Sequence, residues 1–378
     1  MALNSISVRG FRNLEPVAVE FSPTANYVFG PNAAGKTNLL EAIHYLAIGR
    51  SFRRCPDAEL LGFGQEVLVV SGRDDSGRCG EIRFDGREKR LASDGHDRER
   101  LSEYFGWLPV VVLLLDDIEL VRGGPSLRRG FLDMAIAKVD RDYIRVLGAY
   151  RRVLSHCNRL LESAADSDQL PVWEEELVRT GVPVCDKRRE VTDRLLAAAA
   201  GYFRRLAHGS AEFGYWSSIG DGEGLAGQFH ERLASTRRRA VQLRHTLVGP
   251  HRDDLRIRRG DRDLRRFGSV GEQRLAGIAL RLAEADLLLG SGGRPVFLLD
   301  EIASELDEER AGLVFRLIAE RGQMIYAAAR RISGAWAADA RSTAARDAPA
   351  SLESLNPRSL DPCSSKEFHV ESGRITPA

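Results

Sequence analysis

The spacing of apolar residues changes along the chain. Apolar and polar residues alternate over positions 5–21 and again over 67–91, which predicts a two-stranded hairpin followed by a β-meander. Over positions 127–206 apolar residues recur at helical spacing, which predicts long amphipathic helices with a break at 164–171. No strict heptad persists there, so we expect a helical subdomain and not a long coiled coil.

The last third of the chain alternates between helical and strand-like patterns. The expected elements are a helix at 231–243, a strand at 255–258, a helix at 269–289, a strand at 296–299, a helix at 313–318 and a strand at 324–326. This βαβ alternation predicts a parallel sheet. Residues 333–366 are rich in Ala, Ser, Pro and Arg with little periodicity, so we expect a linker or loose insertion before a terminal strand at 368–371.

Composition narrows the possibilities. A chain of 378 residues is long enough for two or three domains, or for one domain with a large insertion. Its 55 basic and 54 acidic residues nearly cancel, which excludes a uniformly basic coat for nucleic acid. The five cysteines have no metal-binding spacing, and the apolar run 110–115 is too short to span a bilayer. We therefore expect a cytoplasmic protein without a membrane partner.

Residues 30–37 match the phosphate-loop pattern G-x-x-x-x-G-K-[ST] between a predicted strand and a predicted helix. The glycines let backbone N–H groups turn inward, and the start of the helix adds positive potential. We expect Lys36 to reach the β- and γ-phosphates of ATP and the Thr37 hydroxyl to bind Mg²⁺. The predicted nucleotide-binding residues are Gly30, Pro31, Asn32, Ala33, Ala34, Gly35, Lys36 and Thr37. A glycine turn with a surface lysine is the alternative, and the flanking elements favour the nucleotide. We expect the 5–21 hairpin to lie at the edge of this nucleotide-binding sheet.

Two carboxylates follow the apolar run 296–299. Asp300 is placed to position Mg²⁺, and Glu301 is placed to orient the attacking water as the catalytic base. Ser304 and Asp307, a few residues later, resemble the D-loop of ABC ATPases.

A serine-glycine turn with the pattern S-x-G-x-Q opens the 269–289 helix, and its residues are Ser269, Gly271 and Gln273. A serine at a helix start is usually an N-cap, with Glu272 here completing a capping box. The same pattern upstream of an acidic strand is the ABC-type signature, whose helix start contacts a γ-phosphate held by another subunit. The two roles are compatible.

Other positions stay open. Arg12 is either a turn cation, which the sequence favours, or a phosphate contact. His251, in the segment 249–255, is a ligand, a base or a structural turn residue. Basic clusters at 151–152, 187–189, 204–205 and 237–239 fit a solvated helix face at least as well as a nucleic-acid contact.

In this order, the motifs resemble the RecF family of SMC-like ATPases, and the resemblance runs through most of the chain. It is carried by Gly10-Phe11-Arg12-Asn13, the phosphate loop with Asn38, Leu40-Glu41-Ala42-Ile43, Gly49-Arg50-Ser51-Phe52-Arg53, Leu120-Val121-Arg122-Gly123 with Pro125, Arg128-Arg129, Phe131-Leu132-Asp133, residues 249–255, 269–273 and 299–306, and Phe368-His369-Val370-Glu371. The 249–255 segment is particularly specific, since transporter ATPases and SMC proteins do not carry it in that form.

The resemblance implies an α/β fold, in which an ABC-type P-loop ATPase head with a mixed sheet and flanking helices carries an inserted α-helical arm. The expected domain boundaries are 1–122 and 245–332 for the head, 123–244 for the arm, 333–366 for the insertion or linker, and 367–378 for a terminal strand of the head.

The resemblance also implies a function in recombinational repair and replication restart. Two heads would close head to tail on two ATP molecules, each bound by Lys36 of one subunit and by Ser269, Gly271 and Gln273 of the other. Asn38 and Arg12 complete the predicted ATP-binding set. The homodimer would bind DNA at junctions between single and double strands, work with RecR and RecO mediators, and help load recombinase. Its enzymatic activity would be a weak DNA-stimulated ATPase.

The chain departs from the family where a polar residue usually senses the γ-phosphate, because Ala327, Ala328 and Ala329 stand there. We therefore expect slow hydrolysis. Two rival functions are a small-molecule kinase, which leaves the Ser269 turn unexplained, and a transporter's ATP-binding subunit, which gives no role to the helical arm.

Overall fold

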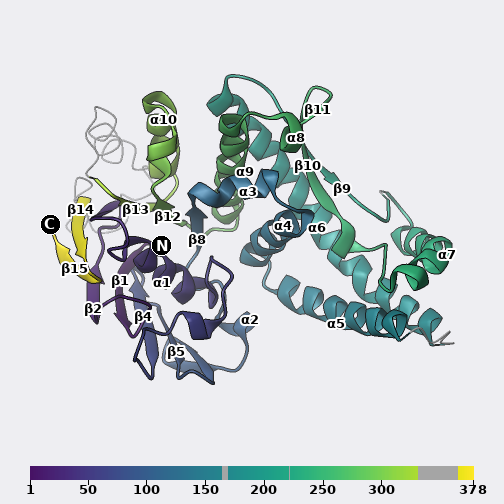
Figure 1. Cartoon of the computed structure of the whole chain (residues 1–378), viewed down its shortest axis with the longest axis horizontal. Coiled ribbons are helices and arrows are strands. Elements are labelled where there is room, and N and C mark those ends of the chain that lie inside the picture. The colour runs from purple at the N-terminus through teal and green to yellow at the C-terminus, as the bar shows by residue number, and fades with distance from the viewer. Residues whose placement is uncertain (164–168, 221, 331–364) are drawn as a thin grey trace. The chain divides into compact units, whose positions relative to one another are not determined.

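The computed structural model describes residues 1–163, 169–220, 222–330 and 365–378 (Figure 1). The chain divides into two compact units, one formed by Met1–Asp117 and Glu284–Ala378 and the other by Ile118–Ala283. None of the described helices combines the length and the hydropathy needed to cross a bilayer.

The first unit contains a largely parallel sheet with the strand order β15-β14-β3-β13-β12-β8. Its strands are β3 (Ala25–Phe29), β8 (Val110–Leu113), β12 (Val296–Asp300), β13 (Gln323–Ala328), β14 (Ser365–Glu371) and β15 (Arg374–Pro377). Only β15 runs antiparallel to its neighbour. The strands β3, β8 and β13 are buried along their whole length, as continuous apolar runs in a covered parallel sheet should be. The predicted parallel sheet is confirmed.

The second sheet of this unit is antiparallel, with the order β2-β1-β4-β5-β6-β7. Its strands are β1 (Leu3–Arg9), β2 (Val17–Glu20), β4 (Leu68–Asp74), β5 (Cys79–Phe84), β6 (Lys89–Ser93) and β7 (His96–Arg98). The predicted hairpin and meander are confirmed. The predicted location of the hairpin, at the edge of the nucleotide-binding sheet, is wrong. The alternating burial of β1 gives it one covered and one solvated face, which suits an antiparallel sheet, and it pairs with β2 and β4.

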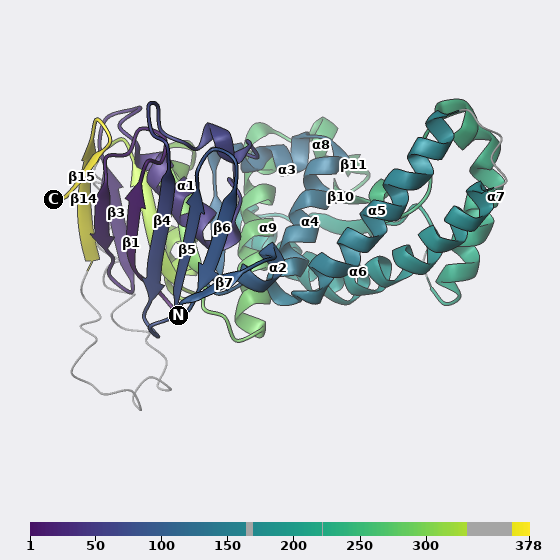
Figure 2. The same ribbon diagram turned by 90° about the horizontal axis from the view of Figure 1, so that it is seen from below.

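Helix α1 (Lys36–Ile48) lies between the two sheets and contacts strands of both. Figure 2 shows it behind the strands of the antiparallel sheet. Most of its residues are buried, because both of its sides are covered. On the parallel sheet, α10 (Glu308–Ala319) also packs against β13. Short helical turns precede and follow β8, at α2 (Leu101–Tyr104) and at Leu115–Ile118.

The second unit is mainly helical. Its helices are α3 (Glu119–Arg122), α4 (Pro125–Val139), α5 (Asp142–Glu162), α6 (Leu170–Ala207), α7 (Leu225–Leu243), α8 (Leu264–Phe267) and most of α9 (Val270–Gly290). A small sheet with the order β11-β10-β9 joins them, formed by β9 (Glu212–Trp216), β10 (Asp254–Arg259) and β11 (Arg262–Asp263). The predicted long helices are confirmed. The predicted break falls mostly on 164–168, outside the described residues, and α6 already begins at Leu170.

The division into two compact units differs from the expected division into domains, and the expected domains stay a prediction. Residues 245–283, which we expected in the head, belong to the second unit. Pairing explains this, because β10 is hydrogen-bonded along its length to β9. The expected insertion at 333–366 lies almost wholly outside the described residues. Its last two positions, Ser365 and Lys366, already belong to β14.

Candidate functional site: a phosphate loop with facing carboxylates

The phosphate loop connects β3 to α1 through a tightly packed turn. A Cβ atom on Gly30 would lie 2.0 Å from the Val370 carbonyl oxygen, so no other residue fits there. Gly35 has φ of 116°, which disfavours residues with a Cβ atom. No side chain caps the start of α1, and its first turn carries no acidic residue. The first N–H groups of the helix are therefore arranged as in an anion-binding helix start.

The Lys36 side chain is folded back onto the loop. Its Nζ atom donates hydrogen bonds to the carbonyl oxygens of Gly30 and Pro31, each at 2.9 Å. The same atom lies 3.8 Å from Glu301 Oε1. A nearly buried ammonium group that is held mainly by carbonyl dipoles can exchange them for phosphate oxygens at little cost in hydrogen bonds.

Thr37 and Asp300 meet across the site, since Thr37 Oγ1 donates to Asp300 Oδ2 at 2.8 Å. The other carboxylate oxygen, Oδ1, is buried and has no hydrogen-bond partner among the described residues. Burial raises the pKa of Asp300 above its ordinary value. An unpartnered buried carboxylate oxygen beside a hydroxyl oxygen is the donor chemistry that Mg²⁺ prefers. These two residues therefore fit the predicted metal site.

Glu301 follows β12 in a left-handed conformation, with φ 51° and ψ 17°. Its N–H group donates to the Ala327 carbonyl at 2.9 Å, and its own carbonyl accepts from Ser304 Oγ at 2.7 Å. A non-glycine residue in this region costs about 1–3 kcal/mol, so the surrounding bonds must hold it there. The result is a half-exposed carboxylate beside Lys36. Ala327 and Ala328 bring only backbone polar groups to this end of β13, as the sequence indicated.

Glu41 is a residue whose importance only its contacts reveal. It is fully buried, and it accepts two hydrogen bonds from Arg12, at 2.5 Å from Nε and 2.9 Å from Nη2. Arg53 Nη1 lies 3.1 Å from the same carboxylate, and Ser51 Oγ donates to it. Arg12 is thus engaged as the turn cation that the sequence favoured, while its phosphate contact stays a prediction. The sequence signal that could have identified Glu41 is a single carboxylate among the apolar positions of this helix.

The Glu41 cluster reaches the phosphate loop through amides. Arg53 Nη1 donates to Asn38 Oδ1 at 3.1 Å, and Asn38 Nδ2 donates to Asn13 Oδ1 at 2.6 Å. Asn13 Nδ2 in turn donates to the Ala33 carbonyl within the loop at 3.3 Å. The cluster therefore helps to fix the loop and the first turn of α1. Asn38, predicted to contact ATP, lies in this chain of hydrogen bonds.

In the second unit, the predicted signature turn is a reciprocal capping box. Ser269 Oγ accepts from the Glu272 N–H group at 3.2 Å, while the Glu272 carboxylate accepts from the Ser269 N–H group at 2.9 Å. That bond, with Ser269 Oγ and Arg259 nearby, holds the pKa of Glu272 below its usual value. Gln273 is buried and donates to the Leu264 carbonyl at 2.8 Å. A Cβ atom on Gly271 would meet nothing within 4 Å, so the backbone there is open.

The two D-loop positions form the next turn and helix start in the first unit. Ser304 closes a short 3₁₀ turn, and Asp307 caps α10 by accepting from the Arg310 N–H group at 2.9 Å. Their contact with a second subunit stays a prediction.

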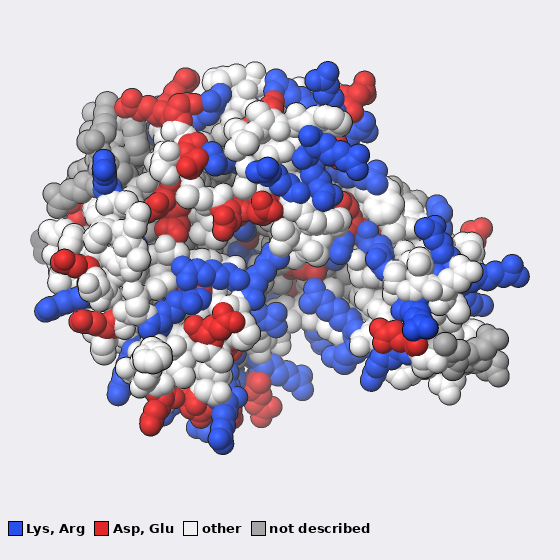
Figure 3. Space-filling model, in the orientation of Figure 1, with Lys and Arg blue, Asp and Glu red and all other residues white. Residues whose placement is uncertain are grey.

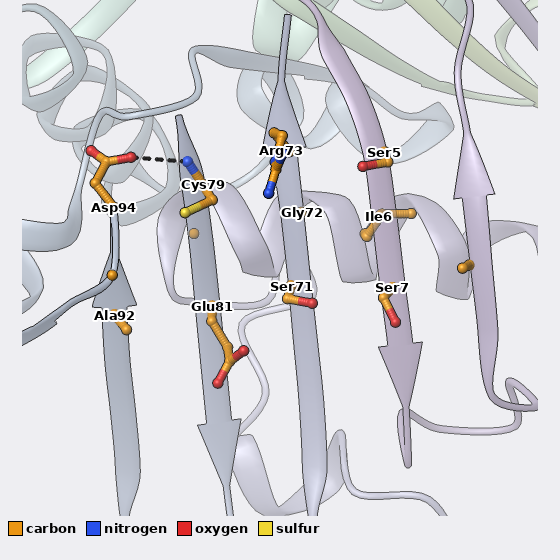
Figure 4. A pocket seen from close by; sticks show the side chains of 13 residues that line it. Ser5, Ile6, Ser7, Ser71, Gly72, Arg73, Cys79, Glu81, Ala92 and Asp94 are labelled. Atoms are coloured by element: carbon orange, nitrogen blue, oxygen red, sulfur yellow. Dashed lines mark hydrogen bonds between the residues drawn. The ribbon is translucent and has the colours of Figure 1, made fainter. Parts of the chain in front are cut away.

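A pocket of about 510 Å³ on the antiparallel sheet shares no residue with the phosphate loop or its carboxylates (Figure 4). Small side chains such as Ser5, Ser7, Ser71 and Ala92 line it. The Cys79 N–H group donates to Asp94 Oδ1 at its edge. No cluster of phosphate-binding groups lines this pocket, so the candidate site is the loop at the start of α1.

Figure 3 shows Lys and Arg side chains interleaved with Asp and Glu over one face of the molecule. This agrees with the net charge of +1 and leaves only local basic regions as candidates for nucleic-acid contact.

Comparison with known proteins agrees with this geometry. Residues 5–122 match the family model described as an AAA domain. The DNA replication and repair protein RecF of Symbiobacterium thermophilum is 36% identical over 335 residues, which cover 85% of this chain and 89% of that protein. RecF of Moorella thermoacetica is 39% identical over 337 residues, which cover 85% and 88%.

Solved structures give the same picture. The recombination mediator protein RecF in the RecFOR pathway, solved as RecF-ATPrS, has a TM-score of 0.85 and 27% identity, covering 99% of this chain and 97% of that one. An Smc head domain from Pyrococcus furiosus, at 16% identity and a TM-score of 0.55, shares the fold.

The sheet arrangement, the phosphate loop and the acidic strand end define the fold of an ABC-type P-loop ATPase head, and the Smc head domain shares this fold. At this level of identity and coverage, the family is clear. The chain belongs to the RecF family of DNA replication and repair proteins.

Proposed function

We propose that this protein is an ATP-dependent DNA-binding protein of recombinational repair. Within the RecF family, the observation that carries the proposal is the convergence of Lys36, Thr37, Asp300 and Glu301 on one phosphate-binding turn. RecF has been solved with ATP, and this chain keeps the groups that a triphosphate needs.

Each residue has a role that follows from its contacts. Lys36 Nζ would leave the loop carbonyls for the β- and γ-phosphate oxygens. Thr37 and Asp300 would hold Mg²⁺, an ion that neutralises phosphate charge when it is bound. Glu301, half exposed beside Lys36, would orient and deprotonate the attacking water. The alanines after Tyr326 offer no side-chain sensor, so hydrolysis should be slow and weakly stimulated by DNA.

Two copies would close head to tail on ATP, with Ser269 and Gly271 of one copy facing the triphosphate of the other. The open backbone at Gly271 supports this arrangement. Phe267 and Val270 flank the turn with 68% and 52% of their surfaces exposed, and a second copy would cover them. Because γ-phosphate contacts exist only before hydrolysis, ATP would favour the closed state and hydrolysis would release it. The side-chain amide of Gln273 donates to backbone carbonyl oxygens, so this residue would stabilise the turn from its buried side.

The closed dimer would bind DNA at junctions between single and double strands and act in the cytoplasm with RecO and RecR mediators to load recombinase. The test is ATP turnover and ATP-dependent retention of gapped duplex DNA, with Lys36→Ala as the matched control. We expect the wild type to retain DNA only with ATP and to hydrolyse ATP faster when DNA is present. Equal retention with and without ATP, together with unstimulated turnover, would refute the proposal.

A further inference from the structure

A second pocket lies wholly within the second unit, where α4, α5, α6 and the 249–255 segment meet. Its volume is about 240 Å³. The charged and polar residues that line it are Ser126, Arg129, Asp133, Tyr150, Arg151, Arg188 and His251. Three arginines therefore face one carboxylate in a space large enough for a small anion.

The positive charges in this pocket are only partly balanced. Arg188, buried to 2% exposure, pairs with Asp133 at 2.7 Å and with Asp253 at 3.4 Å. Arg151 shares Asp133 at 3.0 Å and keeps 59% of its side chain exposed. Arg129 donates to the Asp253 carbonyl oxygen at 2.9 Å, and no carboxylate pairs with it in the described part of the chain.

Arg129 is held where its charge is disfavoured. It is the fifth residue of α4, a 15-residue helix whose first turn carries no acidic residue. Burial and the neighbouring Arg188 lower the pKa of Arg129, and the nearby carboxylates of Asp254, Asp133 and Asp253 offset this only in part. The protein therefore keeps a cation in a place where an anion would offset both the burial and the repulsion from Arg188.

His251 cross-links the pocket wall through hydrogen bonds and adds no charge to it. Its Nε2 lies 3.1 Å from the Thr246 carbonyl, which can only accept, so Nε2 carries the proton and Nδ1 accepts from the Tyr150 hydroxyl at 2.6 Å. Burial lowers the pKa of His251 to about 4, so the ring is neutral near pH 7. Of the roles left open by the sequence, the structural turn residue is the one that these contacts support.

We propose that this pocket binds a single phosphate group, held by the guanidinium groups of Arg129 and Arg151 and by the Ser126 hydroxyl. The planar donors of arginine match phosphate oxygens. If the proposed function holds, the source is a backbone phosphate of DNA. Free phosphate is the other source of the same chemistry.

The test uses the full-length protein and three variants, Arg129→Gln, Arg151→Gln and the control Arg145→Gln. Arg145 lies on the same helix as Arg151, but it is 72% exposed and outside the pocket. Binding of gapped duplex DNA is titrated against salt concentration in the presence of ATP. We expect Arg129→Gln to reduce the slope of log K against log salt by about one and the affinity by about tenfold. Arg151→Gln should act in the same direction, and Arg145→Gln should leave both values unchanged.

A second arm omits DNA and ATP and measures the melting temperature with inorganic phosphate against chloride at equal ionic strength. If phosphate stabilises the wild type and not Arg129→Gln while the DNA slopes agree, the site binds free phosphate. If neither the slope nor the phosphate response depends on Arg129 or Arg151, the proposal is overturned. Should Arg129→Gln fail to fold, Arg151→Gln decides by the same two readouts. Failure of the wild type to bind DNA would count against the proposed function, and the phosphate arm would still test the pocket.

Discussion

Replacing Glu41 by glutamine removes one negative charge from the centre of the cluster that supports the phosphate loop. The side chain keeps its shape, so the packing of α1 around this position is preserved. The carboxylate now accepts two hydrogen bonds from Arg12, contacts Arg53 and accepts from Ser51. In the variant one oxygen becomes an amide nitrogen, which presents donors to the donors of Arg12.

The expected cost follows from burial. Removing one partner of a buried ion pair typically costs about 3–5 kcal/mol. Glu41 is fully buried, but Arg12 keeps 20% and Arg53 39% of their side chains exposed, so water can rehydrate the arginines in part. We therefore expect the lower end, about 3 kcal/mol, which is a shift of about 1 M in the urea midpoint for a slope near 3 kcal/mol per M.

The assay is urea unfolding of the first unit, followed by the fluorescence of Trp107. This residue is 5% exposed, and its indole donates to the Leu46 carbonyl at the end of α1. Replacing Trp173, Trp216 and Trp336 by phenylalanine leaves Trp107 as the single reporter. Glu88→Gln is the matched control, since Glu88 pairs with Arg90 at the surface and its loss should not move the midpoint.

Two results would refute this reasoning. A shift below about 1 kcal/mol would mean that the arginines are satisfied without the carboxylate. Full additivity with Arg12→Met in a double-mutant cycle would mean that the Arg12–Glu41 bonds contribute nothing specific.

Three further predictions concern the nucleotide site itself. Lys36→Ala should abolish ATP-dependent dimerisation, because the γ-phosphate loses its counter-charge, and unchanged sedimentation with ATP would contradict this. Glu301→Gln should bind ATP but not hydrolyse it and so stay longer on DNA, while a shorter residence time would exclude Glu301 as the base. Because the pKa of Asp300 is raised, Mg²⁺-dependent ATP affinity should be complete above that pKa and fall as pH drops through it, earlier than for an exposed aspartate. Asp300→Asn should bind weakly at every pH, and an equal pH profile in both proteins would disprove the assignment.

Much of the candidate nucleotide site could be proposed from the sequence because its chemistry is local in sequence. The spacing of Gly30, Gly35 and Lys36 determines a phosphate-binding turn, and an apolar run ending in Asp300 and Glu301 determines a buried strand with acids at its end. The structure confirms the strand and the helix around the loop and brings Thr37 within 2.8 Å of Asp300.

Contacts between distant segments could not be predicted in the same way. Alternation identified the 5–21 hairpin but not its sheet, because a strand pattern states which faces are buried and not which neighbour pairs with it. The 245–283 segment belongs with the helices because β10 pairs with β9. In the sequence, Glu41 is one residue of a motif. Only the fold shows that its buried carboxylate contacts Arg12 and Arg53.

The sequence alone therefore determined the family, the phosphate loop and the order of elements, since these depend on residue types at fixed short spacings. Only the tertiary structure decided which charges are balanced. Arg129 and Arg128 are neighbours in sequence, yet Arg128 pairs with Asp254 at 2.7 Å, while Arg129 donates to the Asp253 carbonyl oxygen and forms no ion pair within the described residues. The energy of a charge depends on its burial and on the partners that folding brings to it, and the local sequence specifies neither of these.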